Sequence, residues 1–123
     1  EASVKLSELS IGIGPFVIEP AVSRKIGKTA LAELSLVAGE WKSAAWAKEK
    51  GLFANTFATI EKLDEAVSIL THQLASYNPE AVTEMKKVLW EGTEHWDNLL
   101  VERATITGKL VLSEATKSAL KRN

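Results

Sequence analysis

Hydrophobic residues in the second half of the chain recur at helical spacing. From Thr59 onward they follow one another at alternating gaps of three and four positions, and the first such series is Ile60, Leu63, Val67, Leu70 and Leu74. This period places them along one face of an α-helix, with Thr59 as its N-cap and Glu61 near the positive end of its dipole. The pattern therefore predicts an amphipathic helix that begins after Thr59.

Further start signals predict three more helices in this half. Asn78-Pro79-Glu80 combines an N-cap, a proline at the first helical position and an early acid. After a turn at Glu91-Gly92, we expect Thr93 to cap a long helix, and Ser113 to cap a short terminal one. The buried face expected for the second helix is Val82, Met85, Val88 and Leu89. The third helix presents Trp96, Leu99, Leu100, Arg103, Ile106 and Leu110.

The first half has a mixed pattern. Residues 4–13 are rich in β-branched and aliphatic side chains and lead into Gly12, Gly14 and Pro15, which predicts a strand that ends in a tight turn. Helices are expected over residues 16–26 and 28–38, ending at Gly27 and Gly39, and a third capped by Ser43 and closed by Gly51. Residues 52–57 are expected to form a brief edge strand.

The fold class expected from these patterns is mainly α with one or two short strands. Strands and helices are mixed up to about Ala58, and only helices follow. We therefore expect a boundary there, between residues 1–58 and a helical subdomain at residues 59–123, whose apolar stripes imply a partner surface.

Composition excludes several classes of protein. A net charge of −1 over 123 residues gives no basic stripe for nucleic acid. The absence of cysteine excludes a disulfide framework and a thiolate metal site, and suits a cytoplasmic protein. No run approaches the roughly 20 apolar residues of a membrane span. His72 and His95 stand apart, without the i, i+4 partner that a metal site uses, and Gly12 and Gly14 lack the rest of a phosphate-binding loop.

Four segments of the first sixty residues, taken in order, resemble one family. They are Glu8-x-x-x-Gly12-x-x-Pro15, Arg24-Lys25-Ile26-Gly27, Leu34-x-x-Val37-Ala38-Gly39-Glu40, and Ser43-Ala44-x-x-Ala47-x-x-x-Gly51-Leu52. Both residue type and spacing resemble those of the crotonase, or enoyl-CoA hydratase/isomerase, superfamily. The resemblance implies the C-terminal half of an α/β crotonase fold, a ββα spiral whose N-terminal half precedes this chain.

The same resemblance implies a function and a site. Glu8 matches a catalytic glutamate that works as acid and base on an enoyl-CoA thioester, with CoA as part of the substrate and no other cofactor. Gly12, Pro15 and, near the C-terminus, Lys121 are the expected substrate-binding residues. In the family the oxyanion-hole amides and the first acid lie upstream, so the isolated chain is expected to be inactive, and hydratase cannot be separated from isomerase.

Alternatives remain open at the sequence level. An acidic residue such as Glu8 is ordinarily a surface carboxylate; apolar burial by Val4, Leu9, Ile11 and Phe16 would instead raise its pKa and suit it to proton transfer. The apolar stripes after Thr59 imply a partner surface, which by resemblance is a homotrimer or a dimer of trimers. They could equally pack on the absent N-terminal half. The rival function is a non-catalytic helical interaction or oligomerisation module.

Overall fold

The computed structural model describes residues 1–122, which form two compact units. Unit 1 consists of residues 1–55 together with residues 98–122, and unit 2 consists of residues 56–97. The chain thus leaves unit 1 after Asn55 and returns to it within its fifth α-helix. The functional division predicted at residue 58 stays a prediction, since the compact units separate residues by packing alone.

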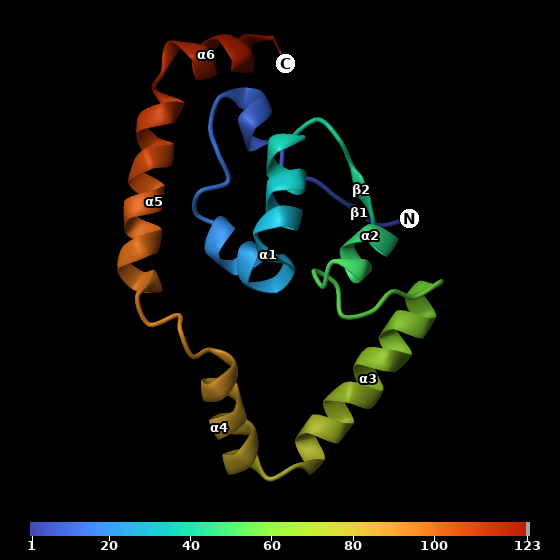
Figure 1. Ribbon diagram of the computed structural model, residues 1–123. Coiled ribbons are helices and arrows are strands. Elements are labelled where there is room, and N and C mark those ends of the chain that lie inside the picture. The colour runs from blue at the N-terminus through green and yellow to red at the C-terminus, as the bar shows by residue number, and fades with distance from the viewer. Residues whose placement is uncertain (123) are drawn as a thin grey trace. The chain divides into compact units, whose positions relative to one another are not determined.

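Unit 1 combines a small sheet with helices (Figure 1). Strands β1 (Ser3–Val4) and β2 (Lys42–Ser43) are antiparallel, with Ser3 opposite Ser43 and Val4 opposite Lys42. Between them lie a 3-10 turn, η1 (Glu8–Ile11), and helix α1 (Glu19–Leu36). Helix α2 (Ala44–Glu49) follows β2, and the C-terminal end of the chain adds most of α5 (Trp96–Val111) and all of α6 (Glu114–Lys121).

The core of unit 1 lies along α1. Val22, Leu31 and Leu34 are buried together, and five partly buried residues from neighbouring segments pack on them: Val4, Leu6, Ile26, Trp46 and Leu52. Gly27 interrupts α1 with a φ of 77° and a ψ of 169°, so two helical segments meet there at a kink. The helix end predicted at Gly27 is confirmed by this kink, because almost only glycine adopts that conformation.

Two strand predictions in this half are wrong. The strand expected over residues 4–13 stops at Val4, because Ser10 Oγ donates to the Ser7 carbonyl (2.6 Å) and the chain curls into η1. Such local side-chain bonds compete with a strand ladder. The strand expected at residues 52–57 is a turn, in which the N–H groups of Leu52 and Phe53 both donate to the Ala47 carbonyl.

Unit 2 contains helices α3 (Ile60–Ser76) and α4 (Pro79–Leu89) and the first residues of α5. The predicted caps of the first two helices are confirmed: Thr59 Oγ1 accepts from Lys62 N–H (3.2 Å) and Asn78 Oδ1 accepts from Glu80 N–H (3.0 Å). The cap expected at Thr93 is wrong. Its hydroxyl turns back to donate to the Trp90 carbonyl (2.6 Å), and α5 starts three residues later.

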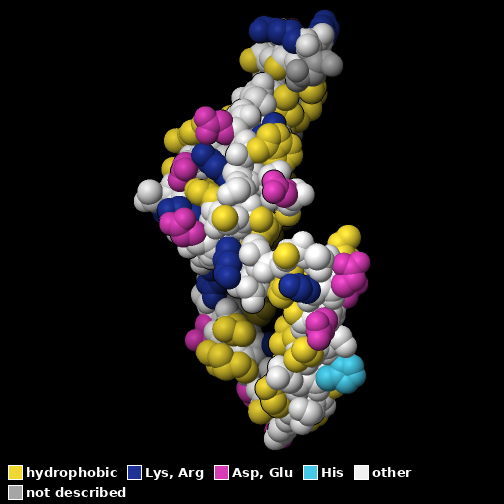
Figure 2. Space-filling view, turned by 90° about the vertical axis from the view of Figure 1, so that its right-hand side faces the viewer, with side chains coloured by type: hydrophobic (Ala, Val, Ile, Leu, Met, Phe, Trp, Pro, Cys, Tyr) yellow, Lys and Arg dark blue, Asp and Glu magenta, His cyan; other side chains and the backbone are white. Residues whose placement is uncertain are grey.

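The helices of unit 2 expose their apolar faces. No residue from 56 to 97 is buried, and the predicted stripe on α3 is exposed by between 44% (Leu63) and 73% (Ile60). Figure 2 shows hydrophobic side chains at the surface on the viewed face of the molecule. Among the described residues, no helix has the length and apolar character needed to cross a bilayer.

Candidate active site

The turn that carries Glu8 is closed by local hydrogen bonds. Glu8 is the first residue of η1, and Gly12 caps the turn with a φ of 86°, in the left-handed region that glycine enters without strain. Two amides then bond backward: Gly12 N–H to the Leu9 carbonyl (3.3 Å) and Ile13 N–H to the Glu8 carbonyl (3.1 Å). The backbone of Glu8 is therefore fixed by the two residues that follow the turn.

The Glu8 side chain carries a buried and unpaired oxygen. The residue as a whole is half-buried, yet its Oε2 is out of contact with solvent and has no hydrogen-bond partner within residues 1–122. Buried carboxylate oxygens are costly unless they are paired, so this atom calls for a partner, such as a water or a substrate. Of the apolar residues expected to surround it, Val4, Ile11 and Phe16 are half-buried, whereas Leu9 is exposed.

The C-terminal helix packs on this turn through Thr116. The side chain is 1% exposed, and its Oγ1 donates to the Gly12 carbonyl (3.0 Å). A Cβ built on Gly12 would lie 2.6 Å from that hydroxyl and 3.0 Å from the Thr116 Cα, which is closer than real contacts allow. Gly12 is therefore required both by its backbone conformation and by the close approach of α6.

The segment from Gly14 to Phe16 leads from the turn into α1. Gly14 is buried, and a Cβ there would lie 2.6 Å from the ring of Phe16, so the ring covers the glycine. The Pro15 carbonyl accepts the Glu19 N–H (3.0 Å) at the start of α1. Glu8, Gly12 and Pro15 thus lie on one continuous segment between β1 and α1.

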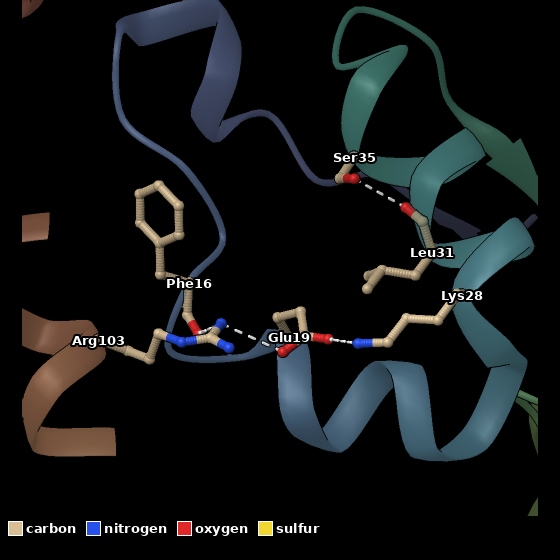
Figure 3. Close-up of polar contacts among 6 residues, drawn as sticks. All are labelled: Phe16, Glu19, Lys28, Leu31, Ser35 and Arg103. Carbon is tan, nitrogen blue, oxygen red and sulfur yellow. Dashed lines mark hydrogen bonds and ion pairs between the residues drawn. The ribbon is translucent and has the colours of Figure 1, made fainter. Parts of the chain in front are cut away.

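A charged network anchors the same segment from α5. Arg103 Nη1 donates to the Phe16 carbonyl (3.3 Å) and to Glu19 Oε2 (3.2 Å), while Lys28 Nζ binds the other oxygen of Glu19 (Figure 3). The hydrogen bond from Lys28 is the largest cause that lowers the pKa of Glu19. A hydrogen bond with Ser23 and then the positive charges of Lys28 and Arg103 lower it further, although partial burial acts in the opposite direction. Figure 3 also shows Ser35 donating to the Leu31 carbonyl within α1 (2.8 Å).

The other predicted site residue is on the C-terminal helix. Lys121 is exposed on the last turn of α6, and its part in binding a substrate stays a prediction. His72 Nδ1 contacts the Ser68 carbonyl of its own helix (2.7 Å). Within the described part of the chain, no group of three or more His, Asp or Glu side chains could hold a metal ion.

The sequence pattern does not reveal the contacts that two residues, Arg103 and Thr116, make in this region. The helical period groups Arg103 with Trp96 and Leu99, but it does not reveal which carbonyl and carboxylate the guanidinium reaches. Thr116 follows the predicted cap Ser113 by three positions, which signals a helix start and gives no sign of a contact 104 residues away. Only the tertiary fold brings either residue to the Glu8 segment.

Comparison with known proteins gives matches among solved structures. The chain aligns over 98% of its length with an enoyl-CoA hydratase/isomerase from Pseudoalteromonas atlantica T6c (TM-score 0.86, 19% identity). It aligns over 99% of its length with OdaA from Pseudomonas aeruginosa (TM-score 0.86, 21% identity). The chain spans about half the length of these structures, 48% and 50% respectively. Neither protein-family models nor curated protein sequences give a match.

At identities of 19% and 21%, this likeness is one of fold. It confirms the fold expected from the resemblance: a mainly helical chain with a two-stranded sheet that superimposes on about half of a crotonase structure. The chain therefore has the fold of this part of the enoyl-CoA hydratase/isomerase structures.

Proposed function

We propose that the whole protein containing this chain is an acyl-CoA hydratase or isomerase, with Glu8 as its acid-base residue. The observation that carries the proposal is the buried Oε2 of Glu8, which has no partner among residues 1–122. It belongs to a segment of a fold shared with an enoyl-CoA hydratase/isomerase. A half-buried carboxylate with one unpaired oxygen is suited to accept a proton from a bound water or from a substrate carbon.

Two reactions fit this arrangement. In hydration, the oxygen of a water bonds to the β-carbon of the enoyl thioester, and a proton is delivered to the α-carbon through an enolate. Glu8 would hold that water, take its proton as the carbon–oxygen bond forms, and return a proton to the α-carbon, so that it ends as the carboxylate. In isomerisation, Glu8 would remove a proton from one carbon of the acyl chain and return it to another. Both require N–H donors at the thioester oxygen, which we assign to parts of the protein outside this chain, so the chain alone is proposed to be inactive.

Substrate contacts are proposed for Gly12, Pro15 and Lys121. Lys121 is exposed at the end of α6 and could reach a phosphate of CoA as a point charge. Pro15 is half-buried beside the Glu8 turn. Gly12 already has a structural reason to be glycine, since Thr116 occupies the space that a Cβ would fill. A substrate contact at Gly12 would therefore use its backbone.

An assembly role is supported by a different observation. Not one residue of unit 2 is buried, although α3 and α4 carry continuous apolar stripes. Exposed apolar surface of this kind is typical of protein interfaces. We propose that it forms contacts in a homotrimer or a dimer of trimers, or with the rest of the protein. A non-catalytic interaction module is the alternative function that the same stripes favour.

The test is an assay of the whole protein with a trans-2-enoyl-CoA for hydration and a trans-3-enoyl-CoA for isomerisation. Glu8→Gln keeps the size of the side chain and removes its basicity, so kcat should fall by about 100-fold or more. The matched control is Glu84→Gln, an exposed glutamate on α4 paired only with Lys87 in this structure. Unchanged turnover in Glu8→Gln would remove Glu8 from the mechanism, and absence of both activities in the wild type would favour the interaction module.

A further inference from the structure

One buried hydroxyl joins the two ends of the chain. Thr116 is the largest of the fully buried side chains in the described residues, and it is polar. Its hydroxyl crosses from α6 to the Gly12 carbonyl, at a distance of 3.0 Å. Buried polar groups are costly unless they are bonded, so a threonine at this position is stable only while the Glu8 turn supplies its acceptor.

The Thr116 hydroxyl belongs to a short chain of hydrogen bonds that runs from Ser113 to Gly12. Ser113 Oγ donates to Thr116 Oγ1 (3.1 Å), and Thr116 Oγ1 donates onward to Gly12. Ser113 Oγ also accepts the Thr116 N–H (3.2 Å), which caps the first turn of α6. Hydroxyl chains of this type polarise one another. Cap, buried hydroxyl and glycine carbonyl therefore form one unit.

Holding the Gly12 carbonyl also holds Glu8. The N–H groups of Gly12 and Ile13 bond back to the carbonyls of Leu9 and Glu8, so the backbone at residues 8–13 is closed into a ring of contacts. The Glu8 carboxylate has an unpaired buried oxygen, and no side-chain bond in residues 1–122 orients that atom. Its position follows that of the turn, and α6 packs on the turn through the Thr116 hydroxyl.

We propose that Thr116 is a positioning residue: α6 clamps the η1 turn through the Thr116 hydroxyl and so sets the place of the Glu8 carboxylate. The clamp is a claim about the structure alone, whereas its effect on turnover rests on the function proposed above. A misplacement of about 1 Å in a reacting group can cost about 100-fold in rate, so a contact that never touches substrate can matter to catalysis.

The test uses Thr116→Val, which keeps the shape and removes the hydroxyl, and Thr116→Ser, which restores it. Hydrogen exchange of the whole protein is followed by mass spectrometry in a peptide covering residues 8–14. Exchange there should rise about tenfold in Thr116→Val, because the Gly12 carbonyl loses its buried partner, and should return to the wild-type rate in Thr116→Ser. Thr105→Val is the matched control, since that exposed hydroxyl bonds only within α5.

Turnover supplies the second readout. In Thr116→Val, kcat should fall by about tenfold or more with KM within about twofold, and Thr116→Ser should recover most of kcat. Unchanged exchange at residues 8–14 overturns the clamp, whatever the reaction is. Raised exchange with unchanged kcat overturns the positioning role. If Glu8→Gln is as active as the wild type, the proposed function fails while the exchange result still decides the clamp.

A second variant tests the clamp in case the Thr116→Val protein does not fold. Ser113→Ala leaves Thr116 in place but removes its hydrogen-bond donor and the cap of α6. Exchange at residues 8–14 should rise by a smaller factor than in Thr116→Val, while exchange in α3 stays unchanged. Equal exchange in wild type and Ser113→Ala would then overturn the proposal.

Discussion

At the scale of single residues, two polar side chains of unit 1 reach between segments that are distant in the sequence. Arg103 and Thr116 both bind backbone carbonyls of residues 12–16, one from α5 and one from α6. A sequence motif singles out Glu8, but no motif singles out Arg103 or Thr116. Helical period shows only which residues share a face with Arg103, and a threonine three positions after a cap is ordinarily just a residue of the first turn.

Glu19 gives the pH dependence expected at this scale. Its folded-state pKa lies below the ordinary value of 4.5, chiefly because Lys28 donates to it. A lowered pKa contributes stability above the unfolded value, and that contribution is lost as the pH falls through the folded value. Glu19→Gln should therefore lower the free energy of unfolding by about 1 kcal/mol at pH 7, and this difference should shrink below about pH 4.5.

The measurement is urea unfolding of the wild type and the variant at pH 7 and at the lowest pH where both fold. Glu114→Gln is the control, because that exposed glutamate pairs only with Lys117 one turn along α6. Exposed pairs of this spacing contribute about 0.5 kcal/mol or less. A Glu19→Gln deficit that stayed constant with pH would show that its charge is not what stabilises the fold.

At the scale of elements, local sequence signals predict the starts of the helices correctly, but they predict strands that the structure does not contain. Caps at Ser43, Thr59, Asn78 and Ser113 are confirmed because each needs only a side-chain oxygen and an amide two or three residues away. The strands depend on a partner. Residues 4–13 have strand-forming side chains, but within residues 1–122 only Val4 of this segment pairs with another strand, opposite Lys42.

Gly27 offers a sharp test of the kink in α1. A Cβ at this position would meet nothing within 4 Å, so packing does not demand glycine. Its φ of 77° and ψ of 169° require glycine, because these angles cost other residues about 1–3 kcal/mol. Gly27→Ala should lower the free energy of unfolding by that amount.

The matched control for Gly27 is Gly108 in α5. A Cβ there would also meet nothing within 4 Å, but the residue lies within a regular helix. Gly108→Ala should therefore stabilise the protein by about 0.5–1 kcal/mol. The two substitutions, identical in chemistry, should differ in sign when unfolding is measured by urea titration. Equal effects would mean that the kink is not held by backbone conformation.

At the scale of the whole molecule, the two units use their apolar residues differently. In unit 1 the side chains of α1 are buried against β1 and α2. In unit 2 the stripe on α3 was predicted correctly in period, yet no residue of this unit is buried. Periodicity reveals which residues share a face, but it cannot say what covers that face. The matched structures are about twice as long as this chain.

Assembly through that face can be tested at Leu70, which lies in the middle of the stripe and is 54% exposed. Leu70→Glu would place a charge in a desolvated interface, where burial without a partner is costly. Sedimentation velocity of the whole protein should then show a smaller species than the wild type. Lys62→Glu is the control, since it puts the same residue on the polar side of α3 and should leave the assembly unchanged. If both variants sediment as the wild type does, the stripe makes no contact between copies. If Leu70→Glu sediments as the wild type does while folded but has a lower free energy of unfolding, the stripe packs within one protein.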